Sequence, residues 1–441
     1  MSKDGQSNIQ RIGAILNSFD DVNTPQDSAD IIRNLDLNRS TGFGLVRALT
    51  RSGWLERVDH GTLRLGQKAA ELAFTPLEAP SVDAARRLSF KQSTRLSSHT
   101  QPELGLDPAL TRLVDTSAYE TKGPWRLGFA NASTSNAWRR AMVSSIHYGQ
   151  RVAKNKIDQI IMTNAKDDTD LQLAQIDELA SQDIHLLLVS LVSVVDKRLS
   201  DKLAQLAASG LPIIAIDRRP EDRNSLVSFV TASDYRIGYV SALWLAEYLG
   251  GHGRVWMLSG VDGTSPALRR QHAALSTFSD FPGIRIEAVS HTDWTQDGGY
   301  QAVDRLLEAT GSPPDGVWCD SGLQGLGSLS RLLELQGLPP AHTGGDLNGM
   351  YRLCLDNKVP MVALDYPASM GARAVQVAVD VLSGTPVPQR VEVPLTTIMP
   401  RGCETTSVKA DIWAEMHVDW NRSDDAVLSQ GAALSQSGFR R

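Results

Sequence analysis

The chain has 441 residues and a mass of 47.9 kDa, which is more than one hydrophobic core usually holds and indicates two or three domains. Hydrophobic residues make up 41% and charged residues 21% of the chain, and these near-average values exclude a largely disordered or collagen-like protein. The formal net charge of −6 excludes a uniformly basic nucleic-acid binder but leaves room for a local basic patch.

Residues 1–75 show the pattern of three short helices followed by a hairpin. Apolar residues at helical spacing between positions 9 and 19 predict the first helix. Asp27 opens a second helix over residues 28–35, and Asn38 is a candidate N-cap for a third over residues 39–52. Gly53 ends the third helix, and residues 54–65 contain two strand-like runs around a turn signal. This order of elements is typical of a winged helix-turn-helix.

Positive charge gathers in this predicted domain, because residues 31–70 hold seven cations and three anions. Such a patch suits contacts with DNA phosphates. The runs NIQRIGAILNSF, DLNRSTGFGLVRALTRSGWLERV and TLRLG resemble the IclR-type winged helix-turn-helix. The resemblance implies a partner, operator DNA, and the DNA-binding residues Asn38, Arg39, Ser40, Thr41, Phe43, Arg47 and Arg64. Gly44 stands where that family commonly has arginine, which leaves the operator preference open.

Residues 76–123 are rich in proline, serine and threonine and contain one basic amphipathic stretch over residues 84–95. We expect a linker with one helix, which is either a connector that transmits movement or a solvated spacer.

Residues 124–403 alternate between short apolar strands and helix-patterned segments. The predicted strands cover residues 126–130, 159–164, 186–190, 212–217, 226–231, 254–259, 285–289, 316–320 and 359–365. This alternation indicates parallel sheets with helical crossovers, and nine strands exceed one sheet of ordinary size. The sequence therefore predicts a multi-domain protein, a mainly α winged helix-turn-helix plus a two-lobed α/β fold with parallel sheets.

Polar side chains follow these strands, where ligands of open parallel sheets bind. They include Asp217-Arg218, Asp234, Asp320-Ser321 and Asp365-Tyr366. Carboxylates, guanidiniums and an aromatic face are the groups that recognise polyhydroxylated ligands.

The stretches GFANASTSNAWRRAM, LPIIAIDRRP, VTASDYRIGYVSALWLAEYLGG, GVWCDSGLQGLGS and DYPASMGARAVQVAVDVLSG resemble the type 1 periplasmic-binding-protein fold of LacI-like sensors and of ribose and galactofuranose receptors. The resemblance covers residues 124–403 and implies these ligand-binding residues: Ser133, Thr134, Ser135, Asn136, Ala137, Trp138, Arg139, Asp217, Arg218, Arg270, Ser321 and Asp346. Ser321-Gly322 replaces the Asn-Asp of many sugar receptors, so the identity of the sugar stays open.

Together these features predict a sugar-responsive DNA-binding transcription regulator. Its effector, a monosaccharide by resemblance, binds between the lobes and alters DNA binding by the heads of a homodimer or larger homo-oligomer. Three alternatives remain open: the same architecture sensing a nucleoside or an amino acid, a solute-binding receptor of a transporter, and an enzyme on a nucleotide-binding fold. The first 20 residues contain no apolar core of a signal peptide, so we expect a cytoplasmic protein without membrane association.

The remaining signals are weak. Cys319, Cys354 and Cys403 lack metal-ligand or CxxC spacing, so we predict reduced structural cysteines and no metal site. We find no nucleophile elbow, HExxH or phosphate-binding loop, and we therefore expect no catalytic residues and no cofactor. The pattern of residues 404–441 predicts a docking helix followed by a disordered end.

Overall fold

The computed structural model describes residues 11, 12, 15, 16, 18, 26–35, 37–58, 61–65, 112–220, 223–335, 337 and 339–436. Two compact units contain them, one with the residues up to 65 and one with the residues from 112 onward. The expected linker over residues 76–123 lies outside the described residues up to position 111. Within the described residues, no helix is both long and apolar enough to cross a membrane.

The N-terminal unit, called the head below, packs two described helices on a small antiparallel sheet. The helices are α2 (Ser28–Asn34) and α3 (Arg39–Arg51). The strands are β1 (Gln26–Asp27), β2 (Leu55–Arg57) and β3 (Thr62–Leu65), in the order β1-β3-β2. The second and third predicted helices and the hairpin are confirmed. Most of the first predicted helix lies outside the described residues.

Local chemistry explains these boundaries. The Asp27 carboxylate accepts from the backbone N–H groups of Ala29 and Asp30, and Asn38 caps α3 by accepting from Ser40 N–H. The head's core contains Ile31, Val46 and Leu63 at 2% exposure or less. Seven residues of α2 and thirteen of α3 are short for independent helices, so this apolar contact stabilises both.

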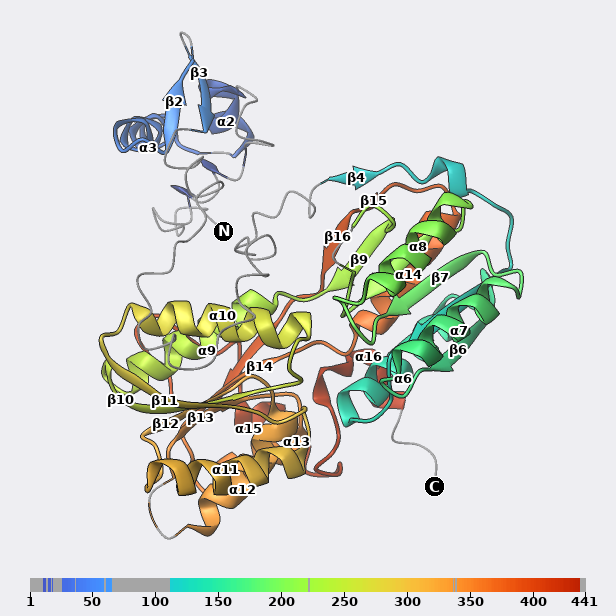
Figure 1. Ribbon diagram of the computed structural model, residues 1–441. Coiled ribbons are helices and arrows are strands. Elements are labelled where there is room, and N and C mark those ends of the chain that lie inside the picture. Colours follow the sequence, from blue (N-terminus) through green and yellow to red (C-terminus); the bar gives the residue numbers. More distant parts are fainter. Residues whose placement is uncertain are drawn as a thin grey trace. The chain divides into compact units, whose positions relative to one another are not determined.

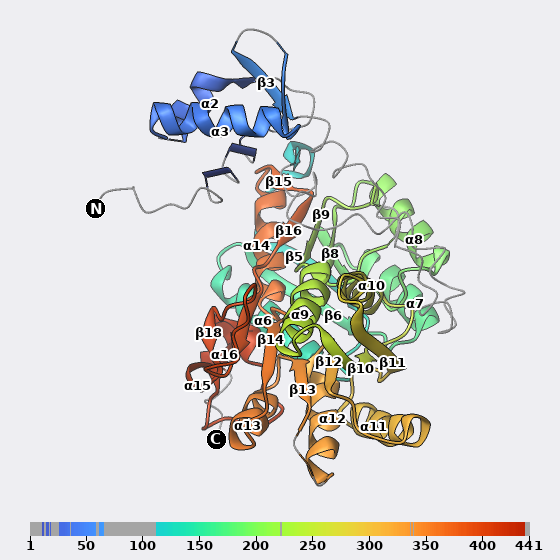
Figure 2. The same ribbon diagram turned by 90° about the vertical axis from the view of Figure 1, so that its left-hand side faces the viewer.

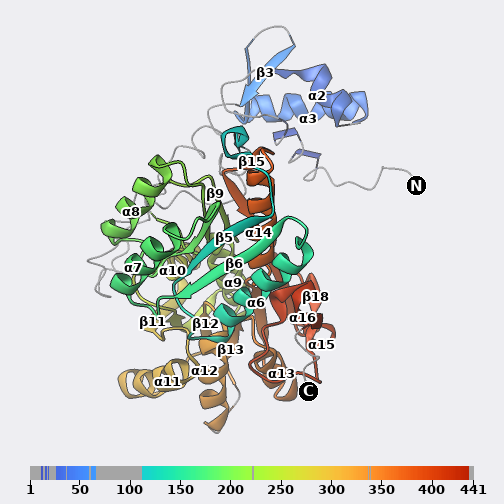
Figure 3. The ribbon, with the colours of Figure 1, turned by 90° about the vertical axis from the view of Figure 1, so that its right-hand side faces the viewer.

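The second unit contains two α/β lobes (Figure 1). The N-lobe has a fully parallel sheet in the order β16-β9-β8-β7-β5-β6. Its strands are β5 (Trp125–Asn131), β6 (Ile157–Asn164), β7 (Leu186–Ser190), β8 (Ile213–Ile216), β9 (Ser228–Thr231) and β16 (Arg390–Glu392). Helices α6 (Ala137–Val152) and α14 (Met370–Leu382) cover one face, and α7 (Thr169–Ala180) and α8 (Lys197–Ala208) cover the other (Figure 3).

The C-lobe has a mixed sheet in the order β11-β10-β12-β13-β14-β17-β18, in which only β14 and β17 pair antiparallel. Its strands are β10 (His252–Ser259), β11 (Gly283–His291), β12 (Gly316–Cys319), β13 (Ala341–Gly344), β14 (Met361–Asp365), β17 (Thr396–Met399) and β18 (Ile412–Trp413). Helices α9 (Asp234–Tyr248) and α10 (Ser265–Ser279) pack above the sheet in Figure 1, and α11 (Gln296–Thr310) and α12 (Gly322–Glu334) pack below it. Helix α13 (Asn348–Asp356) packs on α12.

Three crossovers join the lobes in the described part of the chain. The first runs from β9 to α9, the second from β14 to α14, and the third from β16 to β17. Residues at the crossovers therefore lie beside the junction of the two lobes. All nine predicted strands of this unit exist, and their parallel arrangement within each lobe confirms the predicted fold class.

The structure contains elements that the sequence pattern did not predict. These are β13, the crossover strands β16 and β17, and a separate antiparallel pair of β4 (Leu113–Val114) with β15 (Val387–Pro388), next to the 3-10 helix η3 (Ser117–Tyr119). All of them have four residues or fewer, too short for periodicity to identify.

The C-terminal extension also differs from expectation. Its expected docking helix is the short strand β18 followed by the single turn α15 (Ala414–His417). The chain then continues through the 3-10 helix η4 (Leu428–Gln430) to α16 (Ala432–Gln436). Buried Val427, Leu428 and Ala433 attach this segment to the unit.

Candidate functional site

Polar and aromatic residues of both lobes meet at the carboxyl ends of the strands. We call nine of them the interlobe cluster: Arg139, Ser190, Asp217 and Arg218 from the N-lobe, Asp234, Arg270, Trp294 and Asp320 from the C-lobe, and Tyr366 from the second crossover. Every member is buried. Buried charge is costly unless it is paired, so this concentration of charge requires an explanation.

On the N-lobe side, Arg139 is held by a carboxylate and a hydroxyl. Its guanidinium lies 2.7 Å from Asp217 Oδ2 and donates to Ser190 Oγ at 2.8 Å. Arg139 is in the first turn of α6, and Asp217 follows β8 with a left-handed φ of 63°. The arginine and the aspartate each expose only 4% of their side chains, so this is a buried, charge-assisted pair.

Arg218, next to this pair, is poorly satisfied. Its Nε lies 3.9 Å from Asp217 Oδ2 and has no hydrogen-bond partner among the described residues. A second guanidinium nitrogen reaches the carbonyls of Leu191 and Val192 at 3.4 Å each. Burial, together with the nearby Arg139 charge, lowers the pKa of Arg218 to about 10. The site therefore contains a buried donor that a ligand oxygen can satisfy.

On the C-lobe side, Arg270 from α10 is tightly paired. Its Nε donates to Asp234 Oδ1 at 2.9 Å, and a terminal nitrogen donates to the Asp320 carbonyl at 3.1 Å. Burial alone lowers the pKa of Arg270, but the carboxylates of Asp234 and Asp320 outweigh burial, so the pKa is raised. Arg270 stays charged.

The Asp320 carboxylate orients a tryptophan at the same place. Its Oδ1 accepts from Trp294 Nε1 at 3.0 Å and from Gln324 Nε2 at 2.6 Å, and its Oδ2 accepts from Gly260 N at 3.1 Å. Burial raises the pKa of Asp320, and Arg270 opposes that rise. The Trp294 ring lies 5.9 Å from the guanidinium carbons of both Arg218 and Arg270, so it contacts cations from both lobes.

Tyr366 connects the two halves of the cluster. Its hydroxyl donates to Asp217 Oδ1 at 3.1 Å, and the Arg270 guanidinium lies 4.4 Å from its ring centroid. Its carbonyl accepts from Trp138 Nε1 at 2.8 Å, and the two aromatic rings are 5.1 Å apart. Its backbone N–H donates to Asp346 Oδ1 at 2.8 Å.

Five of the twelve predicted ligand residues are thus brought together. Trp138, Arg139, Asp217, Arg218 and Arg270 are in or beside the cluster. Ser321 and Asp346 form their own pair, in which Ser321 Oγ donates to Asp346 Oδ2 at 2.8 Å. Burial and the neighbouring Asp365 charge raise the pKa of Asp346 to about 7. Contact of any of these residues with a ligand stays a prediction.

The predicted first loop is occupied largely by its own hydrogen bonds. Asn136 caps α6 by accepting from Arg139 N–H, and Ser133 Oγ accepts from Ser135 N–H. Thr134 Oγ1 accepts from Asn164, Ser135 is exposed and Ala137 is the first residue of α6. These contacts shape the loop, so a ligand role for its side chains stays a prediction.

Ser190, Trp294 and Gln324 are not among the residues predicted from the sequence, and Asp234, Asp320 and Tyr366 were predicted at strand ends but not as part of the site. Ser190 ends β7, and Trp294 comes three residues after β11. Position at or shortly after the end of a strand was therefore the available signal for Ser190 and Trp294. Gln324 lies inside α12, where strand-end reasoning does not reach.

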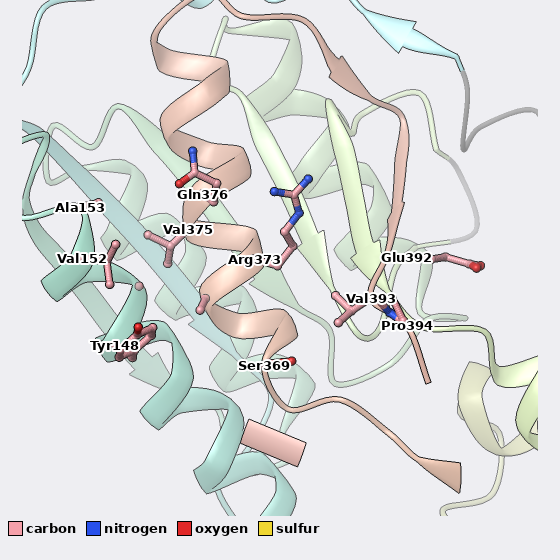
Figure 4. A pocket seen from close by; sticks show the side chains of 12 residues that line it. Tyr148, Val152, Ala153, Ser369, Arg373, Val375, Gln376, Glu392, Val393 and Pro394 are labelled. Carbon is pink, nitrogen blue, oxygen red and sulfur yellow. The ribbon is translucent and has the colours of Figure 1, made fainter. Parts of the chain in front are cut away.

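A surface groove lies elsewhere on the N-lobe (Figure 4). Its volume is about 400 Å³, and it runs between α6, α14 and the third crossover. Its lining includes Tyr148, Val152, Arg373, Glu392 and Pro394, and it contains none of the predicted ligand residues. This groove is therefore separate from the interlobe cluster.

In the head, α3 presents several of the predicted DNA-binding residues. Asn38, Arg39, Ser40 and Arg47 are exposed, and Thr41 is half-buried. Phe43 packs on the apolar core. Arg64 on β3 pairs with Glu56 across the hairpin at 3.0 Å. Packing and ion pairing thus already engage Phe43 and Arg64, and contact of all seven residues with DNA stays a prediction.

Two α/β lobes with charged and aromatic groups buried at their junction define a two-lobed small-molecule binding domain, here with a helix-turn-helix head. Residues 127–386 match the periplasmic binding protein domain model, and the chain belongs to that family. Residues 9–59 match the IclR helix-turn-helix domain model. The first model describes a binding-protein domain and the second a helix-turn-helix domain, and both are non-enzymatic families. The described residues contain no group of three or more histidine, cysteine or acidic residues that could hold a metal.

The chain is similar to the xylitol-binding protein of Mycolicibacterium smegmatis, with 26% identity over 200 residues. These make up 45% of this chain and 56% of that relative, so just over half of its length is spanned. The ribose import binding protein RbsB of Bacillus subtilis is 23% identical over 276 residues, covering 62% of this chain and 87% of that protein.

Solved structures share the two-lobed fold. One is a transporter solute binding protein from Mycobacterium smegmatis with bound glycerol, with a TM-score of 0.60, 21% identity, and coverage of 69% of this chain and 100% of that one. Another is a transporter solute binding protein from Bacillus halodurans with bound myo-inositol, with a TM-score of 0.58, 19% identity, and coverage of 64% and 97%.

Proposed function

We propose that this protein is a transcription regulator whose winged head binds operator DNA and whose interlobe cluster binds a neutral sugar or polyol. The observation that carries the proposal is the joining, in one chain, of an IclR helix-turn-helix match to a buried arginine, aspartate and aromatic cluster between two lobes. Ligand-dependent change in the lobes would alter the placement of two heads in a homodimer on paired half-sites.

The charges in the interlobe cluster support an uncharged ligand. Three guanidiniums, from Arg139, Arg218 and Arg270, accompany three carboxylates, from Asp217, Asp234 and Asp320. A phosphate or carboxylate would add unbalanced negative charge to a buried site. A neutral ligand leaves the balance intact.

The buried polar atoms that lack hydrogen-bond partners support a ligand that carries hydroxyl groups. Arg218 Nε is a donor without a partner, and Gln324 Oε1 and Asn131 Oδ1 are buried acceptors without one among the described residues. A hydroxyl both donates and accepts, so a polyol can serve both kinds of group. The names of the relatives, which bind xylitol and ribose, agree with this chemistry.

The test is thermal unfolding of the full chain with D-ribose, xylitol, L-arabinose, D-fructose, glycerol and myo-inositol, beside nucleosides and amino acids. A ligand that binds only the native state adds about 2.7 kcal/mol to stability at a hundred times its dissociation constant. We expect one sugar or polyol to raise the midpoint. Selection of DNA from a random pool then yields the operator, and the same sugar should change its affinity.

Two results would overturn parts of this proposal. A shift with a nucleoside or an amino acid only would replace the effector class and keep the regulator. Failure of the full chain to enrich any DNA sequence would contradict the regulator and favour a solute receptor.

A further inference from the structure

Residues 404–436, called the terminal segment below, lie beyond the residues matched by the family model and contact both lobes. On the C-lobe side, Ile412 and Trp413 of β18 extend the sheet by pairing parallel with β17. On the N-lobe side, η4 and α16 lie against α6, and the ribbon shows α16 beside α6 in two views (Figures 2 and 3). After the three crossovers, the chain thus returns to the N-lobe along a fourth path.

The terminal segment contacts both the end of β14 and the second crossover that follows it. His417 Nε2 lies 2.9 Å from Asp365 Oδ2. Ser429 Oγ donates to the Tyr366 carbonyl at 2.8 Å and accepts from Ala368 N–H at 3.2 Å, and the Ser429 carbonyl accepts from Ser369 N–H at 3.1 Å. The backbone of residues 366–369 therefore takes much of its hydrogen bonding from one distant serine.

These contacts lead directly to the interlobe cluster. The Tyr366 carbonyl that accepts from Ser429 also accepts from Trp138 Nε1, and both distances are 2.8 Å. Leu428 N–H donates to the carbonyl of Asp346, whose carboxylate accepts from Tyr366 N–H. Ser429 therefore bonds to Tyr366, which is itself hydrogen-bonded to Trp138 of the N-lobe and Asp346 of the C-lobe.

Burial supports a docked segment. Val427 and Ala433 are 1% and 2% exposed, and Leu428 is 7% exposed. The side chain of Ser423, in contrast, donates only within the segment, to Asp425. The segment therefore supplies both a residue on the crossover and a matched residue away from it.

We propose that the terminal segment is an intramolecular brace in which Ser429 is a positioning residue, keeping the second crossover and Tyr366 in the arrangement that joins the two halves of the interlobe cluster. Without the Ser429 hydroxyl, the backbone at Tyr366 and Ala368 loses one donor and one acceptor, and the crossover gains freedom. A site whose competent arrangement is only partly populated binds its ligand more weakly by that fraction. The consequence for affinity rests on the proposed sugar site, and the consequence for the crossover does not.

The test compares Ser429→Ala with Ser423→Ala in the full chain, with Ser429→Thr as a rescue that keeps a hydroxyl. Amide hydrogen exchange is followed at residues 366–370 without added sugar. We expect exchange there to rise at least tenfold in Ser429→Ala, to stay at the wild-type rate in Ser423→Ala, and to recover in Ser429→Thr. A second variant, Ala433→Glu, undocks α16 from α6 and should raise exchange at the same residues.

Spin labels provide a second readout that needs no ligand. Asp201→Cys on α8 and Arg305→Cys on α11 place labels on exposed positions of opposite lobes, and the native cysteines are buried. We expect the distance distribution to widen in Ser429→Ala and Ala433→Glu. Unchanged exchange at residues 366–370, or an unchanged distance distribution, would overturn the brace.

D-ribose and xylitol serve as probes for the consequence at the site. We expect Ser429→Ala to weaken whichever of them binds the wild-type protein by about tenfold. Equal affinity despite faster exchange would refute the positioning role. If neither probe binds the wild type, the effector proposal is in question, and exchange and label distances still decide whether the brace exists.

Discussion

At the scale of single residues, Arg218 is a buried charge that the fold leaves poorly satisfied. Its Nε lacks a partner among the described residues, and burial and Arg139 lower its pKa to about 10. We predict that Arg218→Met leaves the stability of the ligand-free protein unchanged or raises it, because a buried, poorly satisfied charge is replaced by an apolar chain of similar length. The same variant should abolish binding of the sugar identified by thermal unfolding. Chemical denaturation and calorimetric titration measure the two effects.

Two variants provide the contrast for Arg218. Asp217→Ala removes the carboxylate from the buried Arg139 pair and should cost about 3 kcal/mol or more. Arg198→Met changes an arginine that is 59% exposed and should leave both stability and sugar binding close to those of the wild type. A large loss of stability in Arg218→Met would show that this arginine is structural.

His342 gives the protein a predictable response to acid. It is fully buried between Ser328 Oγ and the Thr343 carbonyl, and burial lowers its pKa from 6.5 to about 4. The unfolded chain therefore binds this proton more readily, and stability falls as the pH drops from about 6.5 to about 4. The loss from this one residue reaches about 3 kcal/mol. His342→Gln should flatten the pH dependence of the free energy of unfolding in that range.

Asp346 changes the pH dependence of stability in the direction opposite to His342. Wild type and variant must therefore be compared at each pH. The pKa of Asp346 is raised to about 7, so its contribution to the free energy of unfolding is fully present at low pH and is lost as the pH rises through 7. The difference between wild type and His342→Gln, taken at each pH, isolates the histidine. A difference that is constant between pH 4 and 6.5 would contradict a buried neutral His342.

At the scale of elements, two glycines of α3 have opposite roles. A Cβ on Gly42 would lie 2.8 Å from Ile32 of α2, and one on Gly44 would meet nothing within 4 Å. We predict that Gly42→Ala forces α2 and α3 apart and raises hydrogen exchange of α3 in the full chain. Gly44→Ala should lower exchange, because alanine is favoured over glycine in a helix by about 1 kcal/mol. Equal behaviour of the two variants would argue against the close approach at Gly42.

The same elements show what the sequence could predict. Strand β7 and the second half of β10 are buried and almost entirely apolar, so pattern alone locates them, and the polar residues that follow such strands locate much of the site. Short crossover strands such as β16 and β17 have too few residues to show a period. Their pairing depends on the distant strands β9 and β14, which a local pattern does not reveal. The role of Ser429 depends on a contact 63 residues away in sequence, which no local pattern encodes.

At the scale of the whole molecule, a regulator requires that its two binding activities be coupled. If the sugar changes operator affinity by some factor, the operator must change sugar affinity by the same factor, because both paths close one thermodynamic cycle. We predict a factor of roughly 5 to 150, measured as operator affinity with and without saturating sugar and as sugar affinity with and without operator.

Arg218→Met tests whether sugar binding and operator binding are coupled or whether the two domains bind independently. The variant retains the head unchanged, so its operator affinity should equal that of the sugar-free wild type at every sugar concentration. An Arg47→Ala variant in the head should instead weaken operator binding and reduce its salt dependence by about one unit of slope, with sugar affinity in the absence of DNA unaltered. If wild type binds both sugar and operator with a coupling factor of one, the two domains work independently and the proposed regulation is wrong.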